Sequence, residues 1–352
     1  MNLIEWGWDA SFEDKFEQYK NQNLTAGRIV LESRHLYEVE TETGRMKAKV
    51  SGHYMYTALN RAEYPTIGDW VALKMEDDIA IIEKLVDRKS SFSRKRAGIE
   101  IEEQVIAANI DYVFLVFGLD GGRNFSSGAL ERFLTRSWDS GATPVIILNK
   151  SDLCDDIEQF VLEAEAVAAG TSIFVTSAIT GEGLEKLAGY MTSGKTIAFT
   201  GFSGVGKSAL INSLCGVDLM KTGTQREQDH KGRHTTTRKE LIKLENGSIL
   251  IDSPGIKELQ LWGSEDSLTN SFEDISLISE NCRFKDCSHS GEPGCAVQEA
   301  LAIGELDHRR FENYLDMKKE LKYLESKKDI RSALEKKAKW KKISKFAKSL
   351  KN

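Results

Sequence analysis

The sequence predicts a multidomain protein with an N-terminal β-barrel, a central α/β domain and a C-terminal α-helical domain that contains a metal site. Three observations predict this arrangement. Short β-branched segments fill positions 24–90, apolar strands then alternate with helical segments, and a Cys/His cluster precedes a helical run without proline. The chain of 352 residues has room for several domains, and we expect them at 1–100, 101–270 and 271–352.

The N-terminal segment contains predicted strands at Arg28–Leu31, Met46–Val50, Asp69–Leu73 and Ile79–Ile82. Turn residues at Gly44, Gly52 and 65–68 separate these strands. Short strands at such even spacing are typical of small barrels, and we expect an OB-fold. A sandwich or an SH3-like barrel would give nearly the same pattern.

The central segment has the strand–helix alternation that a parallel sheet requires. Its predicted strands are Tyr112–Phe117, Val145–Leu148, Ile173–Val175, Thr196–Phe199, Leu241–Leu244 and Ile249–Ile251. A polar motif directly follows several of these strands. Ligands bind outside the carboxyl ends of the strands in an open α/β sheet, so the motifs should converge there.

A phosphate-binding loop follows the strand at 196–199. Its glycines let backbone N–H groups point at phosphate oxygens, and the helix that begins near Lys207 adds its positive end. We expect Lys207 to reach the β- and γ-phosphates and Ser208 to bind Mg²⁺. The strand–loop–helix setting favours this interpretation over a chance glycine-rich turn. The predicted nucleotide contacts here are Gly201, Phe202, Ser203, Gly204, Val205, Gly206, Lys207, Ser208 and Ala209.

The tetrapeptide Asn149-Lys150-Ser151-Asp152 follows another strand and predicts guanine recognition. The carboxylate of Asp152 can accept hydrogen bonds from the N1–H and the exocyclic amine of guanine, a donor pair that adenine lacks. We expect Lys150 to stack along the ring and Asn149 to brace the site. Ser177 and Ala178, after the strand at 173–175, are typical of a loop that supports the base.

Two further segments are predicted to respond to the γ-phosphate. Asp252, which opens Asp-Ser-Pro-Gly255, would hold Mg²⁺ through water, and the Gly255 N–H would contact the γ-phosphate. The polar stretch 222–239 is expected to be a first switch loop, in which Thr236 is our choice among three threonines for Mg²⁺. An ordinary β-turn and a flexible surface loop are the alternatives.

The order of these motifs is unusual, because the guanine motif at 149–152 precedes the phosphate loop at 201–208. Together they predict a circularly permuted GTPase. Ile256 occupies the position where Ras-like enzymes have the glutamine that orients attacking water, so we expect slow intrinsic hydrolysis that a partner accelerates. His234 is our catalytic candidate in the switch, alongside His230, Arg226 and Arg233, and each could equally be an ordinary loop residue.

The C-terminal cluster Cys282, Cys287, His289 and Cys295 supplies three thiolates and an imidazole. A closed Cys₃His set is typical of structural zinc, although the spacing differs from the usual Cys-x₂-Cys knuckle. Cys154 lies apart from the cluster and is expected to be a packing residue, as is Cys215.

Charge and hydropathy predict a cytoplasmic protein that binds a polyanion. No apolar run approaches the ~18 residues that span a bilayer, and the N-terminus has no apolar signal segment. Net charge is −6, yet residues 317–352 carry 14 Lys or Arg against 4 Asp or Glu. We expect no membrane contact, and a monomer. An RNA-gated GTPase and a docking switch with little turnover remain competing interpretations, whereas Asn149 and Asp152 argue against a nucleotide kinase or an ATPase.

These motifs, with His-Thr-Thr-Thr237 and the Cys/His spacing, resemble the circularly permuted, ribosome small-subunit-dependent GTPases of the RsgA/YjeQ family. The resemblance covers essentially the whole chain. It implies an OB-fold, a GTPase that binds the small (30S) ribosomal subunit and its rRNA late in maturation, stimulation of GTP hydrolysis to GDP and phosphate by that subunit, and one zinc site. Ala209 departs from the Ser or Thr of many relatives, but Ser208 is intact.

Overall fold

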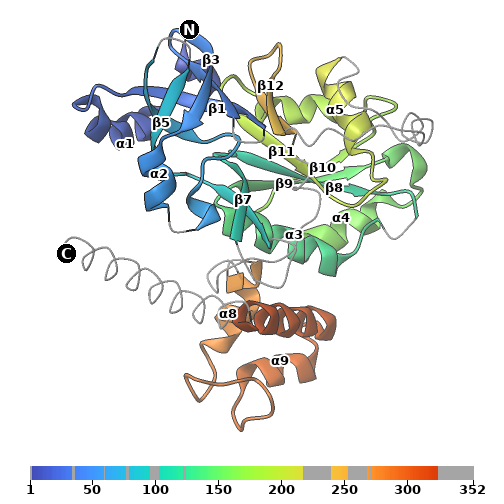
Figure 1. The fold of residues 1–352 in the computed structure, drawn as a ribbon. Helices are drawn as coiled ribbons and strands as arrows, with labels where there is room; N and C mark the ends of the chain where they lie inside the picture. The colour runs from blue at the N-terminus through green and yellow to red at the C-terminus, as the bar shows by residue number, and fades with distance from the viewer. Residues whose placement is uncertain are drawn as a thin grey trace, which may run out of the picture.

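The computed structural model describes residues 2–33, 36–58, 60–76, 79–95, 103–121, 124–216, 239–252, 268–269 and 271–323. Its arrangement confirms the predicted fold class of barrel, permuted α/β domain and helical C-terminal part (Figure 1). The predicted domain boundaries at 100/101 and 270/271 both involve residues outside these ranges, so they stay predictions.

The N-terminal strands close into a five-stranded barrel. The strands are β1 (Thr25–Ser33), β2 (Leu36–Thr41), β3 (Gly44–Val50), β4 (Trp70–Lys74) and β5 (Ala80–Leu85). They follow the order β1-β2-β3-β5-β4, and pairing of β1 with β4 closes the barrel. The β3–β5 pair is parallel and the other barrel pairs are antiparallel, as in the predicted OB-fold.

Short helices surround the barrel. They are η1 (Leu3–Trp6), α1 (Ala10–Lys20), α2 (Gly52–Thr57) and η2 (Arg61–Glu63). Asp9 caps α1 by accepting hydrogen bonds from the backbone N–H groups of Ser11 and Phe12. The Phe12 ring then packs against Trp70 with ring centroids 5.8 Å apart, so α1 covers one end of the barrel.

The central sheet follows the order β10-β9-β8-β11-β13-β12. Its strands are β8 (Tyr112–Gly118), β9 (Thr143–Asn149), β10 (Ile173–Thr176), β11 (Thr196–Thr200), β12 (Lys239–Lys243) and β13 (Ile249–Asp252), and only β12 is antiparallel to its neighbour in this set. The helical segments α3 (Ser127–Ser140) and α4 (Ile157–Glu165) pack on one face. The segments η4 (Leu184–Gly189) and α5 (Lys207–Cys215) pack on the other.

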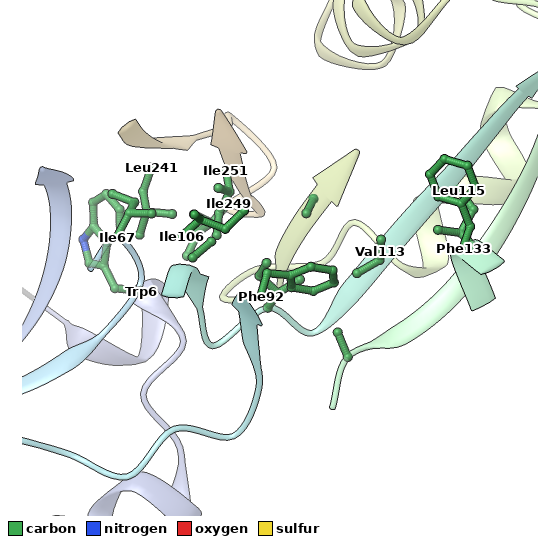
Figure 2. Packing of buried hydrophobic residues seen from close by; sticks show 14 of the residues in the cluster. Trp6, Ile67, Phe92, Ile106, Val113, Leu115, Phe133, Leu241, Ile249 and Ile251 are labelled. Atoms are coloured by element: carbon green, nitrogen blue, oxygen red, sulfur yellow. The ribbon is translucent and has the colours of Figure 1, made fainter. Parts of the chain in front are cut away.

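The barrel and the central sheet are continuous. Strand β12 pairs with β1, with Leu31 opposite Glu240 and Glu32 opposite Lys239, so the described strands of both parts form one sheet. The hairpin of β6 (Ser91–Lys95) and β7 (Glu103–Ala108) lies between them in the chain. Figure 2 shows one buried cluster that runs from Trp6 and Ile67 through Phe92 to Val113 and Leu115.

The C-terminal part contains α8 (Glu273–Ser279), α9 (Ala296–Ile303) and a helix of residues 308–323. These helices share an apolar core of their own, which includes Phe272, Ile275, Val297, Leu301, Phe311, Met317 and Leu321. They lie beneath α3 of the central domain (Figure 1). Within the described ranges, no helix has the length and apolar character needed to cross a membrane.

Candidate nucleotide site and metal centre

The phosphate loop leaves β11 in a conformation that requires glycine. Gly201 has a φ of +140°, and a Cβ atom there would lie 2.1 Å from the backbone oxygen of Val116 in β8. Gly206, at the N-cap of α5, has a φ of +94°, and a Cβ there would lie 2.4 Å from Nδ2 of Asn149. The loop therefore packs directly on the neighbouring strands, with no space for side chains at these two positions.

The loop side chains have distinct surroundings. Val205 is fully buried, whereas Phe202 is 41% exposed and its ring contacts Phe133 of α3 with centroids 5.5 Å apart. The Lys207 ammonium donates to the backbone oxygens of Gly201 (2.7 Å) and Phe202 (2.5 Å), so it folds over its own loop. Ser208 lies in the first turn of α5, beside the N–H groups that lack partners at a helix start.

Asn149 joins the guanine motif to the phosphate loop. It ends β9, is 1% exposed, and donates from Nδ2 to the backbone oxygen of Val205 at 2.9 Å. Its Oδ1 accepts from the N–H of Ala178 at 3.1 Å and from the hydroxyl of Thr176 at 3.3 Å. One buried amide thus ties together three segments that are far apart in the sequence.

Asp152 and Ser177 lie next to Asn149 in the candidate guanine site and contact each other. The Ser177 hydroxyl donates to Oδ1 of Asp152 at 2.5 Å, and the N–H of Ser177 donates to the backbone oxygen of Glu182 at 3.0 Å. The Ser151 hydroxyl donates to Oε2 of Glu182 at 3.1 Å. Asp152 itself is exposed, so its carboxylate is oriented by Ser177 while remaining accessible to a ligand.

The structure adds Asp120 and Asn124 to the site, two residues that the sequence analysis missed. Asp120, in the loop after β8, pairs with the ammonium of Lys150 and also accepts a hydrogen bond from Asn124 at 2.8 Å. Both contacts lower the pKa of Asp120, that with Lys150 most strongly. The available signal was position, because Asp120 follows the carboxyl end of a strand in the same sheet as the recognised motifs.

The predicted γ-phosphate residues are only partly described. Asp252 ends β13, which runs parallel to β11 with Ile251 opposite Ala198, so its backbone lies at the edge of the sheet from which the phosphate loop emerges. Thr236, His234 and Gly255 lie outside the described residues. Their predicted roles therefore rest on the sequence.

The four predicted metal ligands converge in the C-terminal part. The ligand atoms of Cys282, Cys287, His289 and Cys295 all lie within 4.8 Å of one another. Nδ1 of His289 is 3.7 Å from Sγ of Cys282 and 3.5 Å from Sγ of Cys295. Three sulfur atoms and one imidazole nitrogen at these separations fit a single thiophilic metal ion.

Hydrogen bonds from neighbouring residues orient the loop that carries the candidate metal ligands. His289 has a φ of +60°, and its backbone oxygen accepts from the side chain of Gln298 at 2.6 Å. The carboxylate of Glu292 accepts from the N–H groups of Ser288 (2.9 Å) and Ser290 (2.8 Å), on either side of His289. These hydrogen bonds hold the loop in a conformation that brings the four candidate ligands together.

Comparison with known proteins agrees with this geometry. Residues 85–262 match the family described as RsgA GTPase. The chain is 39% identical to "Small ribosomal subunit biogenesis GTPase RsgA 1" of Oceanobacillus iheyensis, over 98% of both chains. It is 41% identical to the protein of the same name from Listeria innocua, over 98% of this chain and 96% of the relative.

Two solved structures share the architecture. YjeQ from Thermotoga maritima is 30% identical, with a TM-score of 0.64 over 85% of this chain and 98% of that one. YloQ, described as a circularly permuted GTPase, is 25% identical, with a TM-score of 0.60 over 85% of this chain and 95% of that one. The motif order, the sheet that unites the motifs and these matches lead to one conclusion: the chain belongs to the RsgA family of circularly permuted GTPases.

Proposed function

We propose that this protein binds the small (30S) ribosomal subunit late in its maturation and hydrolyses GTP to GDP and phosphate, with stimulation by that subunit. The hydrogen bond from Asn149 to Val205 is the structural observation that carries the nucleotide part of the proposal, because it makes the guanine motif and the phosphate loop one site. The names of the relatives, small ribosomal subunit biogenesis GTPases, support the partner.

Each motif residue has a proposed role. Asp152 reads guanine, Lys150 lies along the base, and Lys207 turns from its loop carbonyls toward the β- and γ-phosphates. Ser208, Thr236 and Asp252 would hold Mg²⁺, which neutralises phosphate charge when it is bound with GTP. The N–H of Gly255 contacts the γ-phosphate, and His234 helps to orient water in the complex with the subunit.

The remaining parts are proposed to make the contacts with the ribosomal particle. The barrel of residues 1–100, the GTPase part 101–270 and the zinc-containing part 271–352 act as three units. The basic segment 317–352 supplies rRNA phosphate contacts, whose strength should fall as salt rises. A monomer in the cytoplasm, where ribosomal subunits mature, suits this role.

The direct test is steady-state GTP hydrolysis with and without purified small ribosomal subunits. We expect slow turnover alone, because Ile256 cannot orient water, and strong stimulation by the subunit. Lys207→Ala should abolish turnover under both conditions. Tight GTP binding without any stimulation would contradict the proposal and favour a docking switch that acts on another partner.

Removal of the metal should unfold the C-terminal part. We propose zinc, and we expect Cys287→Ser to lose the bound zinc and to lower the melting temperature, since metal binding supplies about 10 kcal/mol or more in small zinc peptides. Guanine-nucleotide affinity should persist, because Asn149 and the phosphate loop lie outside the cluster. Metal analysis and thermal unfolding measure both effects.

Cys154→Ser is the matched control, since Cys154 is a free cysteine apart from the cluster. It should retain zinc at the wild-type level. Equal metal content in wild type and Cys287→Ser would exclude Cys287 as a ligand.

A further inference from the structure

We propose that Asp120 is a positioning residue for guanine-nucleotide binding, which holds Lys150 in place beside the phosphate loop before the nucleotide arrives. The inference rests on the proposed function, because it assigns Lys150 to the base. It adds a residue from the β8–α3 loop to a site otherwise built from recognised motifs.

The position of Asp120 is fixed from two sides. The N–H of Leu119, the preceding residue, donates to the backbone oxygen of Asn149 at 2.9 Å, which anchors the loop to the guanine motif. The side chain of Asn124 donates to Oδ1 of Asp120 at 2.8 Å, and Lys150 occupies the other oxygen, Oδ2. The carboxylate therefore accepts from Asn124 through one oxygen and from Lys150 through the other, on a loop that Leu119 anchors to the guanine motif.

Lys150 leaves the backbone in a direction that brings it along the phosphate loop. It has a φ of +68°, in the left-handed region, and its Cε lies 3.8 Å from where a Cβ of Gly206 would be. The aliphatic stem thus passes over the loop, and the ammonium reaches Asp120 beyond it. The side chains of Lys150 and Asp120 are only 23% and 21% exposed, so water screens their pairing less than at an open surface.

This arrangement has two consequences for binding. A lysine side chain has four rotatable bonds, and restraining it in the free protein reduces the entropy lost when the base binds. Asp120 also neutralises the ammonium of Lys150, which keeps that cation from turning toward the phosphates. Lys207 is then left as the loop cation that meets them.

The test is the affinity of Asp120→Asn for GDP and for a non-hydrolysable GTP analogue, followed by fluorescence of a labelled nucleotide. Asparagine keeps the shape and the contact with Asn124 but removes the charge. We expect both dissociation constants to rise about fivefold to tenfold, since the pair is partly shielded. With small subunits present, KM for GTP should rise by the same factor while kcat stays unchanged, as for loss of uniform binding.

Two further variants separate positioning from a general structural effect. In a Lys150→Met background, Asp120→Asn should add nothing, because a double-mutant cycle isolates the interaction between the two side chains. Asp155→Asn, an exposed carboxylate in the loop after the guanine motif, is the matched control and should bind as wild type does. The melting temperature of nucleotide-free Asp120→Asn should lie close to that of the control, because a partly exposed ion pair contributes little to stability.

The outcomes distinguish the two proposals. If wild type fails to bind guanine nucleotides, the proposed function fails and the inference fails with it. If wild type binds and Asp120→Asn binds equally well, only the inference is overturned. An equal loss of affinity from Asp120→Asn in the wild-type and Lys150→Met backgrounds also overturns it, because the effect would then bypass Lys150.

Discussion

Arg28→Met is expected to lower the free energy of unfolding by about 3–5 kcal/mol, because it leaves several buried acceptors without a donor. Arg28 lies in β1 and is 1% exposed. Its guanidinium donates to the backbone oxygens of Trp6, Gly68 (3.3 Å) and Asn109 (3.1 Å) and to the hydroxyl of Thr196 (2.8 Å). These acceptors belong to η1, the barrel, the end of the β6–β7 hairpin and the first residue of β11.

The electrostatics explain why a charged group is retained there. Burial lowers the pKa of Arg28 to about 10, so the guanidinium still carries its charge at neutral pH. It also lies over the Trp70 ring, 5.5 Å from the centroid. A single side chain therefore donates the hydrogen bonds that connect the barrel to the GTPase sheet. A methionine of similar length has no donors and cannot make these contacts.

Chemical unfolding of Arg28→Met, Arg28→Lys and Lys49→Met would measure this effect. Lysine keeps the charge but has three donors instead of five. The stability of Arg28→Lys should therefore lie between that of wild type and that of Arg28→Met. Lys49, exposed on strand β3 of the same barrel, is the control and should change stability by less than about 0.5 kcal/mol. Equal unfolding midpoints for Arg28→Met and Lys49→Met would show that the connection between barrel and sheet does not depend on the guanidinium.

The elements that the sequence predicted well are those with strong local signals. All six predicted strands of the central sheet are present, and α5 begins at Lys207 as expected. The predicted guanine and phosphate motifs meet at the Asn149–Val205 hydrogen bond. The local sequence pattern of an apolar strand followed by glycine or by a polar motif is enough to predict these elements, without knowledge of their tertiary contacts.

The elements that it missed depend on distant partners. Strand β2 contains Glu38 and Glu40, a residue type that is typical of exposed positions. Glu40 is nevertheless only 2% exposed, and it pairs with Arg45 of β3 at 2.6 Å. The pairing of β1 with β12 joins Glu32 to Lys239, two residues with no local pattern that relates them. A buried arginine such as Arg28 likewise has the same appearance in a sequence as an exposed one.

Arg310→Ala is expected to weaken the attachment of the C-terminal part to the GTPase part and to lower stability by about 3 kcal/mol, the cost of leaving a buried charge without its partner. Arg310 lies on the helix of residues 308–323 and donates to Glu131 of α3 at 2.5 Å. It also donates to both carboxylate oxygens of Asp274 at 2.7 Å. The Glu131 side chain is 2% exposed, and Asn313 is its other neighbour from the same helix.

The pH dependence follows from Glu131. Burial raises the pKa of its carboxyl group, so the folded protein holds a proton there more readily than the unfolded chain does. A group with a raised folded pKa favours the folded state below its unfolded pKa, and this contribution is lost as pH rises through the folded value. The stability difference between Arg310→Ala and wild type should therefore shrink as the pH is lowered through the raised folded pKa of Glu131, because its carboxyl group then takes up a proton.

Function should be affected through α3, because this helix touches both the C-terminal part and the phosphate loop. Its Phe133 contacts Phe202 of the loop, and Glu131 two residues earlier binds Arg310. In Arg310→Ala we expect guanine-nucleotide affinity to persist and stimulation by small ribosomal subunits to fall. Arg309→Ala is the matched control, since Arg309 is the neighbouring arginine and its side chain is 84% exposed. If both variants were stimulated equally, the contact between Arg310 and Glu131 would be structural only, and the ribosomal signal would have to reach the nucleotide site by another route.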